Sequence, residues 1–207
     1  VVEQHTGWEY DFWRVENDPR GGGTIRAEWG GRTRVDGDGL ASDATAANFG
    51  LLAGIIRFEE LAAGRIDHAL FLFVGCAAEE HVPPAIGNGS ECDDPQDAPA
   101  MGQLFWLDMS FEEIDALDVA PWTKTILRAL AEYGGYAGDT GGNEAFAVHF
   151  ESATSYTGYG QPNPWLVFAD EPGVTSWRGP LRFDIADAVD WGSRLRVIDP
   201  CHATGEC

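Results

Sequence analysis

The run Arg65-Ile-Asp-His-Ala-Leu-Phe-Leu-Phe-Val74 is the most strongly sheet-like part of the sequence. Alternate residues of a strand point to opposite faces, and both faces of this run become apolar toward Val74. The pattern predicts a central strand that is covered on both sides. His68 stands near its start, where burial without a hydrogen bond would cost a few kcal/mol. We therefore expect His68 either to bond a backbone carbonyl in the core or to contact a ligand at the rim of a cleft.

Short strand-like segments recur on both sides of this run. Ser110 and Glu113 form a capping box, which begins a helical insert near residues 110–134. The regular alternation of strand and helix that marks a doubly wound fold is missing. The sequence therefore predicts one mainly β domain over residues 1–207, a jelly-roll-like β-sandwich with a short helical insert. The expected strands are 8–15, 24–29, 65–74, 103–109, 136–138, 144–151, 165–169, 177–184 and 194–198.

The formal charge is −21, with 34 acidic and 13 basic residues. Nucleic acid is excluded as an expected partner because phosphate binding needs an electropositive surface. A membrane is excluded too, since no stretch approaches eighteen apolar residues. A neutral or weakly charged polymer suits this charge better than a polyanion does. The protein is expected to be a monomer or a small homo-oligomer.

Four cysteines permit three pairings. We favour Cys76–Cys92 and Cys201–Cys207, because each would close a polar segment rich in glycine or proline. The alternatives are free thiols or a metal site, but the spacings fit no zinc pattern. Disulfides indicate export, and a chain that starts with Val1 fits a processed protein. The expected location is therefore extracellular.

Two acidic residues, Glu9 and Asp11, share one face of the predicted strand at residues 8–15. Strand geometry places them roughly 7 Å apart, beside Trp13. Glycoside hydrolysis uses two carboxyl groups that flank the scissile bond. We predict Glu9 or Asp11 as nucleophile or base, Asp139 as the acid partner and His68 as a hydrogen-bonding residue that orients them.

Two other functions stay open. His149 and Tyr156 are the residue types with which jelly-roll polysaccharide lyases transfer protons. A non-catalytic carbohydrate-binding protein would instead stack exposed aromatic rings on sugars. In either case we expect Trp13, His149, Tyr156 and Tyr159 to contact the glycan.

The segment Asp36-Gly-Asp-Gly39 places two carboxylates two residues apart, as calcium loops often do. It lacks the bidentate Glu of a full calcium-binding loop. A calcium site near Asp36 and Asp38 and a plain turn therefore both remain open. No other metal and no cofactor is expected.

Three motifs occur in order along the chain: Gly64-x-Ile-Asp-His-Ala-Leu70, Pro99-x-Met-Gly102, and Ala129-Leu-x-x-Tyr-Gly-x-x-x-x-Asp-Thr-Gly-Gly142. Together they resemble a family of uncharacterised, mostly actinobacterial secreted proteins that occur near polysaccharide-active modules. The likeness spans about residues 8–159, and it implies secretion and a carbohydrate context without assigning catalytic residues. Combined with the paired carboxylates, it leads us to expect a secreted glycoside hydrolase that cleaves a neutral or weakly charged polysaccharide.

Overall fold

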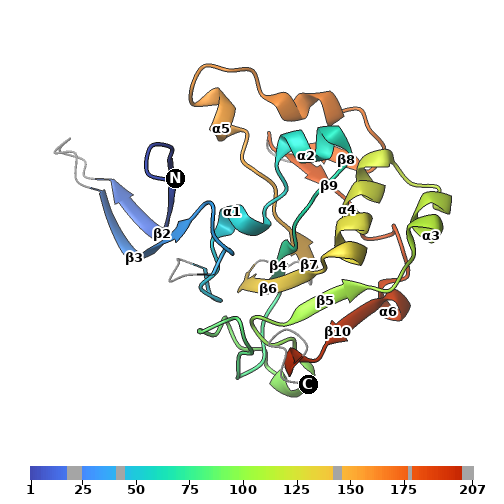
Figure 1. Cartoon of the computed structure of the whole chain (residues 1–207), viewed down its shortest axis with the longest axis horizontal. Coiled ribbons are helices and arrows are strands. Elements are labelled where there is room, and N and C mark those ends of the chain that lie inside the picture. Colours follow the sequence, from blue (N-terminus) through green and yellow to red (C-terminus); the bar gives the residue numbers. More distant parts are fainter. Residues whose placement is uncertain (18–24, 41–44, 142–145, 177–178, 202–207) are drawn as a thin grey trace.

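The structure is a computed structural model of the chain, and it describes residues 1–17, 25–40, 45–141, 146–176 and 179–201. These residues form three sheets and several short helices (Figure 1). Within the described ranges, no helix combines the length and the apolar character needed to cross a membrane.

The first sheet is an N-terminal hairpin with one short additional strand. Strands β1 (Val2–Glu3), β2 (Trp8–Asn17) and β3 (Ile25–Arg34) pair antiparallel in that order. The strands predicted at residues 8–15 and 24–29 are therefore confirmed, and they pair as a hairpin. Figure 1 shows β2 and β3 extending away from the rest of the molecule, on the left of the view.

The central sheet is built around the run that opened the sequence. Its strand order is β10-β5-β6-β4-β7, so β4 is an interior strand as predicted. The strand begins only at Leu70, where the Leu70 N–H donates to the Gly134 carbonyl at 3.0 Å; residues 65–69 precede it. The members are β4 (Leu70–Val74), β5 (Leu104–Leu107), β6 (Gly135–Thr140), β7 (Phe146–Val148) and β10 (Leu195–Ile198).

Helices lie against this sheet. Ser110 caps helix α3 (Phe111–Ala116) through the predicted capping box, and the predicted helical insert continues with α4 (Pro121–Glu132). Helix α4 lies against β5, where the Trp106 indole donates to the Ala131 carbonyl at 2.6 Å. Two further short helices are α1 (Leu51–Gly54) and α2 (Phe58–Ala63).

Gly54 allows helix α1 to approach the central strand closely. A Cβ atom at this position would lie 2.7 Å from the Phe71 backbone nitrogen. The face of β4 that carries Phe71 is therefore covered by α1 and the residues around it.

The C-terminal third is less regular. Residues 165–169 were expected to form a strand, but Pro164–Phe168 form a 3-10 helix. Pro164 begins this helix, and Asn163 Oδ1 accepts a hydrogen bond from the Trp165 N–H at 3.1 Å. That expectation was wrong. The remaining elements are η1 (Pro95–Asp97), α5 (Thr154–Thr157), η2 (Pro164–Phe168), β8 (Val174–Ser176), β9 (Leu181–Phe183) and α6 (Trp191–Arg194).

The prediction of a β-rich fold is confirmed, but the jelly-roll sandwich is not. β4 and β6 run parallel, whereas a jelly roll pairs its strands antiparallel. The central sheet also packs against helices instead of a second large sheet. Alternation within a strand shows which side chains share a face, but it does not reveal which strands become neighbours.

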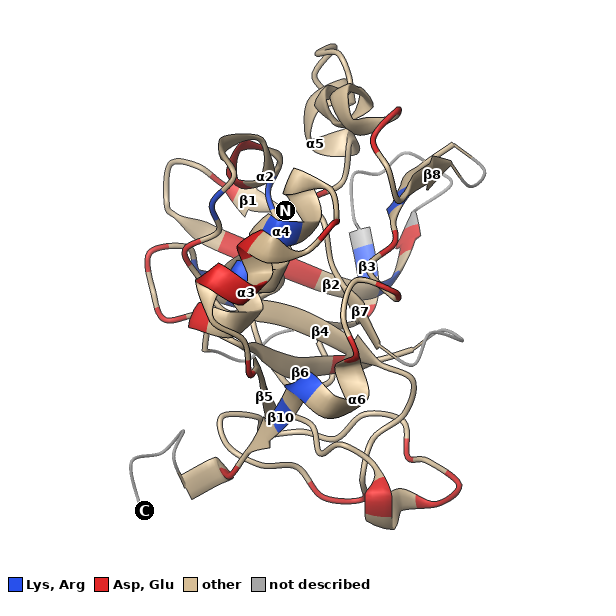
Figure 2. Cartoon of the chain, turned by 90° about the vertical axis from the view of Figure 1, so that its right-hand side faces the viewer, with Lys and Arg blue, Asp and Glu red and all other residues tan. Residues whose placement is uncertain are grey.

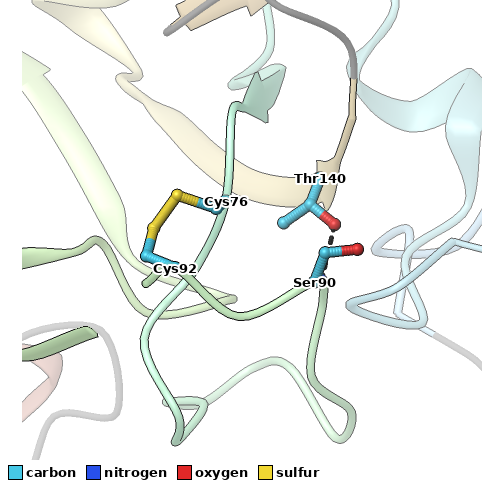
Figure 3. Close-up of a disulfide and its surroundings, with 4 residues drawn as sticks. All are labelled: Cys76, Ser90, Cys92 and Thr140. Atoms are coloured by element: carbon cyan, nitrogen blue, oxygen red, sulfur yellow. Dashed lines mark hydrogen bonds between the residues drawn. A yellow bond between two sulfur atoms is a disulfide. The ribbon is translucent and has the colours of Figure 1, made fainter. Parts of the chain in front are cut away.

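The long loop after β4 carries the predicted disulfide Cys76–Cys92, with a Cα–Cα distance of 5.0 Å (Figure 3). Backbone hydrogen bonds join Ala77 to Ser90 and to Cys92, and the Ser90 N–H donates to Thr140 Oγ1 at 2.8 Å. The loop is thus fastened to the end of β6. The other predicted pairing, Cys201–Cys207, lies outside the described residues because Cys207 does.

Candidate functional site

The two carboxylates that looked catalytic hold the hairpin to the body. Glu9 Oε1 accepts a hydrogen bond from the Leu52 N–H at 2.8 Å, and Asp11 Oδ2 accepts one from the Leu51 N–H at 3.3 Å. Those N–H groups begin helix α1 and have no partner within the helix. Glu9 is only 4% exposed. The shared face was predicted correctly, yet it is turned toward α1 instead of toward a substrate.

The opposite face of the hairpin is an aromatic surface. Trp8, Tyr10 and Phe12 project from β2, paired across the sheet with Arg34, Arg32 and Gly30 respectively, and they line a shallow hollow. The Arg32 guanidinium lies 4.4 Å from the centre of the Trp8 ring, and Phe12 is 49% exposed. A Cβ atom at residue 30 would lie 2.8 Å from the Phe12 ring, so glycine lets that ring lie close to the sheet. We call this face the aromatic platform.

Farther along the hairpin, the anchored face also becomes exposed. Trp13 and Trp29 pair across the strands and are 50% and 55% exposed. The Arg14 guanidinium lies 4.3 Å from the centre of the Trp13 ring and bonds Glu28. Trp13 is therefore accessible, as a sugar-contacting residue must be.

His68 lines a pocket of about 330 Å³ between α1 and the start of β4. Its Nδ1 lies 2.8 Å from the Ala69 carbonyl and its Nε2 lies 3.2 Å from Glu60 Oε1. Both partners only accept, so both contacts are hydrogen bonds only in the imidazolium form. Asp139 and the β2 residues are not among the lining residues, which are Asp38, Gly39, Leu40, Phe49, Gly50, Ala53, Gly54, His68, Ala69, Leu70, Phe71, Pro83, Pro84 and Tyr136.

Asp139 on β6 and His149, which directly follows β7, are both half-buried. Burial raises the pKa of the Asp139 carboxyl, although hydrogen bonds from the backbone N–H groups of Thr140 and Ala46 partly oppose this. Burial lowers the pKa of the His149 imidazole, which stacks on Phe73 with ring centres 4.0 Å apart. Asp139 does not line the pocket that contains His68.

Tyr156 brings together two acidic residues that the sequence did not pair. Its hydroxyl lies 2.9 Å from Glu59 Oε1 and 3.0 Å from Glu151 Oε2. One phenol proton serves one of these contacts at a time. Burial and the two carboxylates raise the pKa of the Tyr156 phenol. Tyr159 lies outside this cluster and is 85% exposed.

No local signal marks the pair, because Glu59 lies in α2 and Glu151 lies in the segment after β7, far along the sequence. His149 and Tyr156, the two residues expected to transfer protons in a lyase, have different partners. His149 contacts Phe73, whereas Tyr156 contacts the two glutamates.

The carboxylates of Asp36 and Asp38, the candidate calcium ligands, bond groups of the protein itself. Arg34 binds both carboxylate oxygens of Asp36 at 2.8 Å, and Asp38 Oδ1 accepts a hydrogen bond from the Leu40 N–H at 3.0 Å. Across the described part of the chain, no three His, Cys, Asp or Glu side chains are grouped as a metal site would require. The plain turn accounts for the contacts seen.

Comparison of the chain with protein-family models, with curated proteins and with solved structures gives no match. The class of protein is therefore described from its fold and its surfaces. The molecule is a β-rich protein with a disulfide-stapled loop, and it carries an anchored hairpin whose outer face is aromatic.

Proposed function

We propose that this protein binds a neutral or weakly charged polysaccharide outside the cell, through the aromatic hairpin. The observation that carries the proposal is the aromatic platform on β2, opposite the face that Glu9 and Asp11 hold against α1. Aromatic rings stack on the apolar faces of sugar rings, and flanking polar groups bond the hydroxyls. The Cys76–Cys92 disulfide fits an oxidising compartment.

The charge distribution supports the choice of ligand. The chain carries a net charge of −21, which repels polyanions. The platform itself holds Arg32 beside Trp8, so it is not an acidic surface. A neutral glycan meets no electrostatic penalty there.

Affinity electrophoresis and calorimetry against a panel of neutral and uronic-acid polysaccharides test the proposal. Phe12→Ala and Trp8→Ala, both on the aromatic platform, should each weaken retention by at least about fivefold, the loss of roughly 1 kcal/mol of stacking. Phe111→Ala is the matched control, because Phe111 is 44% exposed on α3 and belongs to no hairpin surface. Binding that both hairpin variants leave unchanged would remove the hairpin from the proposal.

Glycoside hydrolysis is the second candidate, at a pair of carboxylates other than the predicted one. Glu59 and Glu151 contact the same phenol oxygen, so their nearest oxygens lie no more than about 6 Å apart, close to the spacing in retaining glycosidases. Release of reducing ends from any bound glycan decides between binding and hydrolysis. Glu59→Gln and Glu151→Gln should each abolish that release, whereas Glu112→Gln on α3 should not. Release that survives both substitutions would exclude this pair.

A further inference from the structure

Strand β3 is a long edge of the N-terminal sheet. It spans Ile25–Arg34 and pairs with β2 on one side, and in the described part of the chain no strand lies on its other side. An edge strand presents backbone donors and acceptors that can pair with another chain. Natural edges are often blunted by proline or a bulge, but β3 contains no proline and its register with β2 runs from Ile25 to Arg34 without a shift.

The hairpin also differs from the rest of the chain in charge. Residues 8–34 contain five basic and five acidic residues, whereas the whole chain has a net charge of −21. Figure 2 shows acidic residues spread over the helices and loops of the body. Two copies of such an acidic protein repel each other over most approaches. The hairpin is the neutral exception, and it exposes Phe12, Trp13, Val15 and Trp29.

The sequence of β3 is self-complementary about Gly30. Glu28 precedes Gly30 by two residues and Arg32 follows it by two, so an antiparallel pair centred on Gly30 places each Glu28 opposite the other copy's Arg32. Both residues lie on the same face of the strand. In the same register Trp29 lies opposite Gly31, which leaves room for the indole.

The register satisfies two further conditions. Residues that pair across this axis are an even number of positions apart along the strand. Their backbone N–H and C=O groups therefore point to the same edge of β3 in both copies and can bond each other. Arg26 would lie opposite Arg34, but Arg34 is already paired with Asp36 through two contacts of 2.8 Å. The like charge on Arg34 is thus largely neutralised.

We infer that two copies of this chain associate through β3, antiparallel about a twofold axis at Gly30, into one continuous sheet. The interface is isologous, so each contact occurs twice. The aromatic platform stays outside the joint, on the faces of the sheet. The inference is independent of what that platform binds.

Exchanging the charges of Glu28 and Arg32 tests the proposed register between the two β3 strands. The chain mass is 22.4 kDa, and sedimentation velocity over a concentration series should show conversion to twice that mass. Glu28→Arg or Arg32→Glu alone places like charges together twice, so the dissociation constant should rise about tenfold. The double variant Glu28→Arg/Arg32→Glu should restore association. Arg14→Glu is the control for loss of the Glu28–Arg14 contact within one chain, and it should not abolish association.

A covalent trap tests the same register without relying on charge. In the variant Glu28→Cys/Arg32→Cys the two new thiols are about 13 Å apart within one strand, too far for a bond, but adjacent across the twofold axis. Air oxidation should yield a dimer that runs at double mass until it is reduced. A chain that stays at 22.4 kDa at every concentration would overturn the inference. So would a dimer whose dissociation constant does not change in the charge-exchange variants and which the new cysteines do not cross-link.

Discussion

Replacing Glu9 separates an anchoring role from a catalytic one. The Glu9 side chain is 4% exposed and accepts the Leu52 N–H at 2.8 Å, so Glu9→Ala leaves that donor without its partner. An unsatisfied buried donor costs about 1–3 kcal/mol. Leu52 is only half-buried and water can replace part of the bond, so we expect a loss of about 1–2 kcal/mol in the free energy of unfolding. Glu9→Gln keeps an acceptor oxygen but loses the charge, and it should cost about half as much.

Urea unfolding followed by tryptophan fluorescence measures this loss. For a slope near 2 kcal/mol per molar urea, the midpoint should fall by about 0.5–1 M in Glu9→Ala. Asp11→Asn should shift it less, because the Asp11 contact is 3.3 Å long. If Glu9→Gln unfolded like the unchanged protein but lost glycan turnover, the anchoring explanation would be refuted and the catalytic one restored.

Three more variants probe the fold around the candidate surfaces. Gly54→Ala should destabilise the protein by about 1–3 kcal/mol in thermal or urea unfolding, because its Cβ would lie 2.7 Å from the Phe71 backbone, and an unchanged midpoint would contradict this packing. Cys76→Ser with Cys92→Ser should cost about 3 kcal/mol in urea unfolding, as expected for a loop of this length; a loss below about 1 kcal/mol would mean that hydrogen bonds alone hold the loop. Burial raises the pKa of Asp139 in the folded state, so its stabilising contribution is present at low pH and is lost as the pH rises through that folded-state pKa; Asp139→Asn should remove this part of the pH dependence of unfolding, and identical pH profiles would contradict it.

Local patterns predicted local structure well. Alternation identified β2, and the Ser110 capping box identified the start of α3. Loop composition and cysteine spacing identified the Cys76–Cys92 bond. Each of these signals is complete within about twenty residues, which is why no knowledge of the tertiary fold was needed.

Features that depend on distant partners were missed. The pair Glu59 and Glu151 meets at Tyr156 only because α2 and the segment after β7 lie together. The parallel pairing of β4 with β6 was missed for a similar reason, since the residues that separate them include another strand and two helices. Periodicity reports which face of an element is apolar, but it does not report which element covers that face.

The error at Glu9 shows how one undecided segment changed the functional prediction. Glu9 and Asp11 were correctly assigned to one face, but none of the expected strands or helices covered residues 45–56. That segment contains α1, whose first N–H groups bond both carboxylates. Because side chains alternate along a strand, turning this acidic face inward necessarily turns Trp8, Tyr10 and Phe12 outward. The contacts that weigh against hydrolysis at Glu9 and Asp11 are therefore the same contacts that expose the aromatic platform, and they favour binding as its function.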